Sequence, residues 1–188
     1  HKEGTFTYAD YLQWPDEERW ELIHGIAYNM SPAPGRTHQL LLFDLARRIA
    51  EVTDKGPCDT LIAPFDVRLS IGPVDEADER VETVVQPDIS VFCDPEKIDE
   101  RGAKGAPDLV VEVLSPATAH KDQTEKLKLY DQAGVREYWI VNAEAGYVMV
   151  YRRGDSGSFG KPDYYTREES AESEVLSASI PLSPLFGE

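Results

Sequence analysis

An acidic residue lies in the middle of an apolar strand, and this feature limits the possible folds of the chain most. The segment Asp108–Leu114 has the sequence DLVVEVL, apolar and β-branched on both sides of Glu112, which predicts a buried central strand. An unpaired carboxylate there costs several kcal/mol. A metal ion, a lysine or arginine, or a proton held by a raised pKa could neutralise it. Buried acids mark functional sites more often than structural ion pairs, so Glu112 is the first candidate site residue.

Composition limits the class of protein. The 188 residues suit one domain, and the net charge of -16 argues against broad nucleic-acid binding while leaving room for a local basic groove. No stretch approaches the ~20 apolar residues of a membrane span, and no signal peptide is visible. Cys58 and Cys93 are expected to be two free thiols in an apolar setting, which favours a reducing cytoplasm.

Hydrophobic periodicity predicts a single α/β domain over residues 1–188, with only weak strand signals at 160–188. The expected helices and strands are a helix at 8–13, a hairpin at 20–30, a helix at 37–52, strands at 61–71, 88–92 and 108–114, a helix at 119–133, and a hairpin formed by 137–142 and 147–151. The strands at 108–114 and 137–142 flank a helix, so we expect them to be parallel, with a right-handed crossover.

Two carboxylates and a lysine are expected to meet on this sheet. Asp88 opens one strand, Glu112 is in the middle of another, and Lys126 is on the following helix. Helical spacing puts Lys126 on the same side as Tyr130, beside the buried stripe. Lys128 is turned away by about 200 degrees and should face solvent. Lys126 is therefore the lysine that can approach Glu112.

An acid-acid-lysine group suits phosphodiester hydrolysis with a metal ion. Carboxylate oxygens are ligands that Mg²⁺ prefers, and Mn²⁺ is the alternative cofactor. The metal would polarise the phosphate and lower the pKa of the attacking water, while the lysine holds or activates that water. The other interpretation is an internal network of Asp, Glu and Lys ion pairs without a metal. Residue spacing alone leaves both open.

Eight short motifs and single residues follow one another along the chain in a characteristic order. They are WELIHG at 20–25, MSPAP at 30–34, His38, FDVRL at 65–69, VQPD at 85–88, PDLVVEVLSP at 107–116, KLKLY at 126–130 and GVREYWIV at 134–141. In this order they resemble the Uma family of putative restriction endonucleases, which belongs to the PD-(D/E)xK nuclease superfamily. The resemblance covers about residues 6 to 152. Any one of these motifs alone would be unspecific.

The resemblance implies a restriction-endonuclease-like core of mixed α/β class, with a central mixed sheet flanked by helices and an N-terminal helix and hairpin. It implies that Asp88 and Glu112 bind the metal. The superfamily lysine, expected two residues after the acid, falls at Leu114, and the resemblance implies that Lys126 has taken over its role. Glu21 matches an acidic family position in the first hairpin, completes the catalytic set, and is expected to contact the metal or its waters.

Other matching positions are expected around this group. His38 lies near the start of the first long helix and is assigned with Lys121 to substrate binding, although a packing or hydrogen-bonding role suits His38 equally well. Asp66 also matches a family position. It lies on the polar side of an alternating strand, where simple exposure is the alternative.

Two functions of different kinds follow. The first is a Mg²⁺-dependent endonuclease acting on DNA. The second is a catalytically silent nuclease-like fold that serves as a binding or assembly module, which the strong acidity and the missing lysine favour. We also expect a homodimer, because aromatic side chains at Tyr138, Trp139, Tyr147 and Tyr151 exceed what a small sheet buries alone and soluble oligomers favour closed symmetry.

Overall fold

The computed structural model describes residues 4–15, 17–30, 34–70, 77–115, 119–183 and 185–186. Residues 31–33 of the MSPAP motif, Pro116, and Ile71 at the end of a predicted strand lie outside this part. The α-helices are α1 (Tyr8–Tyr11), α2 (Arg36–Thr53), α3 (Ala119–Lys121) and α4 (Leu127–Ala133). Short 3₁₀ helices cover Asp78–Arg80 and Pro95–Lys97. Among the described helices, none combines the length and apolar character needed to cross a membrane.

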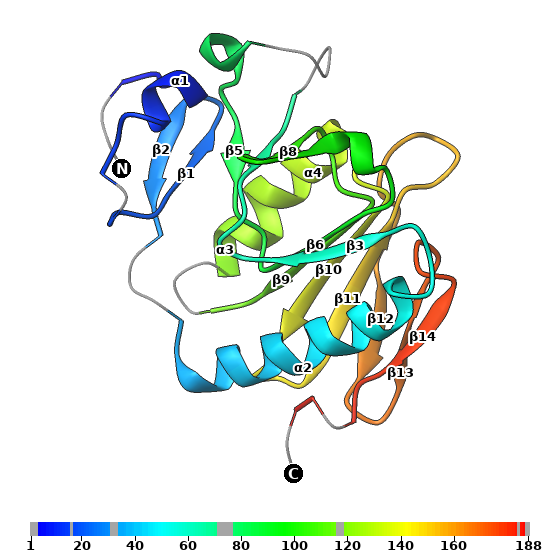
Figure 1. The fold of residues 1–188 in the computed structure, drawn as a ribbon. Helices are drawn as coiled ribbons and strands as arrows, with labels where there is room; N and C mark the ends of the chain where they lie inside the picture. Colours follow the sequence, from blue (N-terminus) through cyan, green and yellow to red (C-terminus); the bar gives the residue numbers. More distant parts are fainter. Residues whose placement is uncertain are drawn as a thin grey trace.

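The largest sheet has six strands in the order β12-β11-β10-β9-β6-β3 (Figure 1). Its strands are β3 (Asp59–Ile62), β6 (Ile89–Phe92), β9 (Leu109–Val113), β10 (Glu137–Asn142), β11 (Tyr147–Arg152) and β12 (Asp163–Thr166). Strands β9 and β10 run parallel, as predicted, and the other pairs are antiparallel. The predicted mixed sheet is therefore present, with β9 and its glutamate among the inner strands.

A second six-stranded sheet, in the order β2-β1-β5-β4-β8-β7, contains the predicted first hairpin. Its strands are β1 (Trp20–Ile23), β2 (Ile26–Asn29), β4 (Val67–Arg68), β5 (Val84–Val85), β7 (Ile98–Asp99) and β8 (Gly102–Lys104). Two further strands, β13 (Ser170–Ser173) and β14 (Ala178–Pro181), pair with each other. Since β1 belongs to this sheet and β9 to the larger one, a site that uses both must form where the sheets meet.

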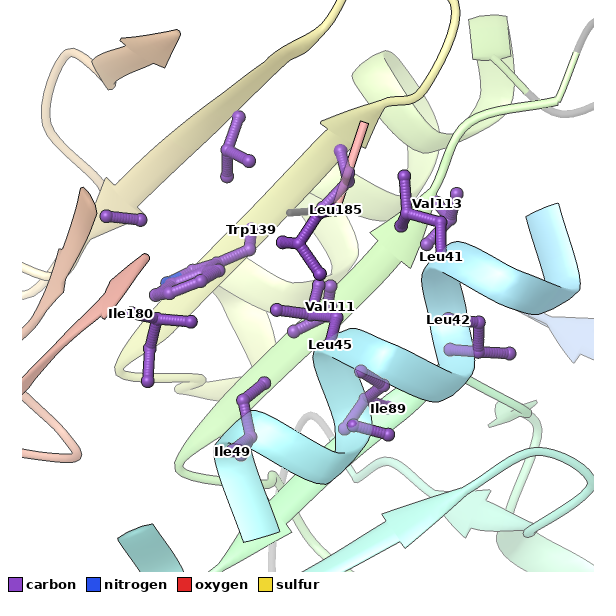
Figure 2. Packing of buried hydrophobic residues seen from close by; sticks show 14 of the residues in the cluster. Leu41, Leu42, Leu45, Ile49, Ile89, Val111, Val113, Trp139, Ile180 and Leu185 are labelled. Atoms are coloured by element: carbon purple, nitrogen blue, oxygen red, sulfur yellow. The ribbon is translucent and has the colours of Figure 1, made fainter. Parts of the chain in front are cut away.

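Helix α2 covers one face of the larger sheet. Its leucines recur at the helical spacing that predicts an amphipathic helix, and Figure 2 shows Leu41 beside Val113 and Leu45 beside Val111, in the same cluster as Ile49 and Trp139. All of these side chains are buried. Burying each large apolar side chain contributes about 1.5–3 kcal/mol, so this packing fixes α2 and the histidine near its start against the sheet.

The segment 119–133 covers the opposite face of the sheet. Leu129 and Tyr130 of α4 pack with Val110, Tyr138 and Ile140, which alternate with the side chains that face α2. Glu112 has the same parity as Val110, so it points toward this helix. Gly134 ends α4 in the left-handed conformation, as predicted, with φ 93°.

Two predicted elements differ in detail. The strand predicted at 61–71 is divided into β3 and β4, which belong to different sheets; Pro64 between them has no N–H for a ladder hydrogen bond. The helix predicted at 119–133 is present, but its middle turn, Asp122–Lys126, is π-helical. Such π-bulges occur frequently at functional sites.

The prediction of two free thiols was wrong. Cys58 and Cys93 form a disulfide, with an S–S distance of 2.01 Å. They flank the antiparallel pair β3–β6, one residue beyond the partners Asp59 and Phe92, so the ladder brings their side chains together. Sequence separation alone gave no sign of this proximity. Because the two cysteines are not free thiols, they no longer support the predicted location in a reducing cytoplasm.

Candidate active site

Asp88 directly precedes β6, and Glu112 lies on the neighbouring strand β9. The β6–β9 ladder ends with the pair Ile89 and Val111, so Asp88 and Glu112 are the next residue beyond that pair on each segment. A hydrogen bond of 2.8 Å from the Val113 N–H to Asp88 Oδ2 extends the contact between the two segments. The two predicted acids therefore lie at the same end of the β6–β9 ladder, close enough for the Asp88 carboxylate to raise the pKa of Glu112.

Lys126 reaches Glu112 from the π-helical turn. Its Nζ lies 2.8 Å from Glu112 Oε1 and 2.9 Å from Glu21 Oε1, and only 4% of the lysine side chain is exposed. Lys128, by contrast, is exposed. The helical-face prediction, which selected Lys126 over Lys128 as the partner of Glu112, is confirmed.

The second sheet supplies Glu21 and its contacts. Glu21 Oε2 lies 2.7 Å from Lys121 Nζ, and Oε1 accepts a 3.1 Å hydrogen bond from the Gln86 backbone N–H as well as the ion pair with Lys126. Lys121 Nζ also lies 4.2 Å from the centre of the Tyr28 ring on β2, a favourable cation–π arrangement. The described contacts of Glu21 are thus to two lysines and to the Gln86 backbone N–H, and the expected contact with a metal or its waters stays a prediction.

His38 lies at the edge of this group. Its Nε2 is 3.0 Å from the Val113 carbonyl oxygen and 3.4 Å from Asp88 Oδ2. When Nε2 carries the proton it donates to that carbonyl, because a carbonyl oxygen can only accept. The geometry supports the hydrogen-bonding role that was left open for His38, next to a predicted metal ligand; its predicted contact with substrate stays untested.

Several functional contacts were not predicted. The Tyr130 hydroxyl donates a 2.8 Å hydrogen bond to Glu112 Oε1, and Asp122 lies 3.7 Å from Lys126 Nζ. The only sequence signal for either was a shared helical side with Lys126. The simple exposure considered for Asp66 was wrong, because its Oδ1 accepts hydrogen bonds from Tyr11 and Gln86.

The charges in this group do not balance. Glu21, Asp88, Glu112 and Asp122 are four carboxyl groups, and the nearby lysines are Lys121 and Lys126. Burial and the carboxylates of Asp122, Asp88 and Glu21 raise the pKa of Glu112 to about 8, despite the opposing effect of Lys126. Burial first, and the neighbouring acids second, therefore favour a proton on Glu112.

Nearby charges and hydrogen bonds move the pKa values of Glu21, Lys126 and His38 against the effect of burial. Burial alone would raise the pKa of Glu21, but Lys126 and Lys121 lower it to about 2. Burial alone would lower the pKa of Lys126, but Glu112, Glu21 and Asp122 hold it well above its ordinary value. The hydrogen bond to Asp88 raises the pKa of His38. Lys126 is thus a permanent cation between a charged Glu21 and a readily protonated Glu112.

We expect the metal-free protein to lose stability as the pH rises from about 5 to about 8. Glu112 has a raised pKa, so its stabilising contribution is complete below its unfolded value of 4.5 and is lost as the pH rises through about 8. Glu21 has a lowered pKa, so its contribution is present above 4.5 and is lost as the pH falls toward about 2.

Thermal unfolding in EDTA across this range measures the effect. Glu112→Gln should have a flatter profile between about pH 5 and 8 than the wild type, because its amide does not titrate. Equal slopes for the two proteins would show that Glu112 does not retain a proton in the folded state.

The donors suit a metal ion that needs few protein ligands. Mg²⁺ is commonly held by one or two carboxylates and keeps several waters, which matches the neighbouring acids Asp88 and Glu112. Within the described ranges, no three His, Cys, Asp or Glu side chains gather as a metal site. A divalent cation beside the pair would also offset the excess negative charge that raises the pKa of Glu112. The residues present therefore fit Mg²⁺ or Mn²⁺.

Comparisons with known proteins bear on the family and the fold. Residues 8–183 match the model of the Uma2 family, described as "Putative restriction endonuclease". The uncharacterized protein slr1290 of Synechocystis is 28% identical over 153 residues, which are 80% of this chain and 75% of that protein. A crystal structure of a putative nuclease belonging to DUF820 from Anabaena variabilis has a TM-score of 0.74 at 19% identity, covering 96% of this chain and 97% of that chain. The predicted fold class is confirmed.

Proposed function

The chain belongs to the Uma2 family of putative restriction endonucleases, and from this membership we propose that it is a metal-dependent endonuclease that hydrolyses phosphodiester bonds of DNA. The observation that carries the proposal is that Lys126 Nζ lies 2.8 Å from Glu112 Oε1, while Asp88 accepts a 2.8 Å hydrogen bond from the N–H of the next residue, Val113. Asp88 and Glu112 would hold Mg²⁺ or Mn²⁺. When bound, the metal supplies a Lewis acid for the phosphate and lowers the pKa of the attacking water.

The side chains around the expected metal ligands would bind substrate oxygens or orient their neighbours. Lys126 has a raised pKa and stays charged, so it suits holding a water or a phosphate oxygen by donating hydrogen bonds and does not suit removing a proton. Tyr130 and Lys126 both donate to Glu112 Oε1 and so fix the orientation of that carboxylate. Glu21 positions both lysines through its two oxygens.

Contact with the DNA is assigned to residues nearer the surface. Lys121 has 20% of its side chain exposed, against 4% for Lys126. Its amine could therefore leave Glu21 and bind a phosphate oxygen of DNA. An acidic protein needs such a cation at the surface that contacts the DNA backbone. His38 lies beside Asp88, where a charged imidazole would also favour a phosphate group.

A second candidate function is a non-catalytic binding or assembly module with the same fold. The observation that favours it is the pairing of both lysines with Glu21 and of Lys126 with Glu112, because such a network can neutralise these charges without a metal. In that case Glu112 would act only in stability.

Assembly and location belong to the proposal as well. A nuclease that cuts both strands of a duplex is suited by a two-fold homodimer, and sedimentation at micromolar concentration would test it. The aromatic surplus no longer supports a dimer, because Tyr138 and Trp139 are fully buried within the chain. The cytoplasmic location now depends on the DNA substrate alone.

Cleavage assays test the main proposal. Supercoiled plasmid and single-stranded DNA are incubated with wild type and Asp88→Asn, each with Mg²⁺, Mn²⁺ or EDTA. We expect cleavage by the wild type with either metal, none in EDTA, and a loss of about a hundredfold or more in Asp88→Asn, because a metal ligand contributes several kcal/mol to the transition state. Absence of cleavage, together with no calorimetric binding of Mn²⁺ by the wild type, would favour the binding module.

A further inference from the structure

A pocket of about 520 Å³ lies beside the candidate active site. Its lining includes aromatic side chains of Tyr11, Trp14 and Trp20, together with the polar side chains of Arg19, Asp66 and Gln86. Its volume is within the range of about 300–1,000 Å³ that is typical of sites for small organic groups. Aromatic walls around a few polar groups suit a flat ligand that also forms hydrogen bonds.

The side-chain amide of Gln86 lies between Arg19 and Asp66 in the pocket. Arg19 donates from Nε and Nη2 to Gln86 Oε1, at 3.2 and 2.8 Å. Gln86 Nε2 donates to Asp66 Oδ1 at 2.8 Å. A guanidinium and a carboxylate therefore lie on either side of the Gln86 amide without pairing with each other.

These two charges have no ion-pair partner in the part of the chain that the structure describes. Both described hydrogen bonds of the Asp66 side chain are to Oδ1, from Tyr11 and Gln86. Oδ2 is thus available as an acceptor. Arg68 and Arg19 act on the Asp66 carboxylate only through space, and a ligand with an acceptor next to a donor would contact Arg19 and Asp66 directly.

The pocket is connected to the active-site group by two short segments. Arg19 and Trp20 directly precede Glu21, and the backbone N–H of Gln86 donates to Glu21 Oε1. Gln86 is also two residues before Asp88. A ligand in the pocket would therefore lie next to the segments that carry Glu21 and Asp88.

We propose that this pocket receives one unstacked nucleobase of the DNA substrate. The proposal rests on the proposed endonuclease function for the class of ligand. Every nucleobase has hydrogen-bond donors next to acceptors along its edge, which matches Arg19 beside Asp66, and its faces stack on aromatic side chains. Bases leave a duplex most readily where they are mismatched or unpaired, so DNA with an unpaired base is the preferred substrate.

Binding in EDTA tests the pocket without catalysis. Fluorescence anisotropy compares a labelled duplex that has one unpaired nucleotide with the same duplex in which that nucleotide is abasic. We expect the base-bearing duplex to bind about tenfold more tightly, within the range for stacking of one base on aromatic side chains.

Asp66→Asn identifies the pocket as the cause. Asparagine keeps Oδ1 as the acceptor for Tyr11 and Gln86 but replaces the available carboxylate oxygen with an amide NH₂. We expect it to remove most of the preference for the base-bearing duplex. Asp59→Asn makes the same change at an exposed position on β3 and should keep the preference.

The outcomes separate this proposal from the proposed hydrolysis. Equal binding of the two duplexes, no DNA binding at all, or equal effects of Asp66→Asn and Asp59→Asn would overturn the base pocket. Nucleoside monophosphates that bind as tightly as the base-bearing duplex would also overturn it, by assigning the pocket to a free nucleotide. Cleavage with Mg²⁺ but no base preference refutes only the pocket, and base preference without cleavage refutes only hydrolysis.

Discussion

Glu112→Gln is expected to lower Mg²⁺-supported DNA cleavage by about a thousandfold or more while the chain remains folded. The amide has the shape of the carboxylate and can accept the hydrogen bond from Tyr130, but it removes the charge that would hold the metal. Because burial and neighbouring acids raise the pKa of Glu112 to about 8, the metal-free site at neutral pH already favours an uncharged group. Stability in EDTA should therefore hold or rise.

Three measurements check this expectation: the cleavage rate, binding of Mn²⁺ by calorimetry, and thermal unfolding with and without metal. Glu100→Gln is the matched control, since Glu100 is exposed, and it should change none of the three. Wild-type rates in Glu112→Gln would remove Glu112 from the catalytic set. A large loss of stability in EDTA with no metal effect in the wild type would instead support a structural ion pair.

Lys126→Met is expected to destabilise the protein by roughly 3–5 kcal/mol, the range for removing one partner of a buried ion pair. The lysine lies within 4 Å of Glu21, Glu112 and Asp122, and methionine would leave these buried acids without their shared cation. Denaturant unfolding measures the loss. Lys128→Met is the control, because the same change at this exposed position of α4 should stay within about 0.5 kcal/mol.

The double variant Glu112→Gln/Lys126→Met measures how the two residues depend on each other. We expect it to recover part of the stability lost in Lys126→Met, because one of the uncompensated acids is gone while Glu21 keeps Lys121 as a partner. Additive effects of the two changes would mean that the ion pair between Glu112 and Lys126 contributes nothing. A loss in Lys126→Met no larger than in Lys128→Met would contradict the buried network itself.

Local sequence patterns determined much of the fold and of the candidate site. The apolar run around Glu112 determined a buried strand, since alternating and continuous hydrophobic patterns follow directly from strand geometry. Helical periodicity selected Lys126 over Lys128 because the side of a helix on which a residue lies depends only on spacing. The ordered motifs identified the family. These inferences succeeded because each depends on neighbours a few residues away.

Long-range pairing decided the rest. Only the ladder between β3 and β6 brings Cys58 next to Cys93, and only the meeting of two sheets brings Glu21 to Lys126. The pKa of Glu112 depends on acids from three other segments, so no local pattern could give its direction. The pocket at Arg19 and Asp66 likewise joins residues far apart in sequence. Sequence selected the chemical groups, and tertiary structure decided which of them share a low-dielectric environment, where their charges interact strongly.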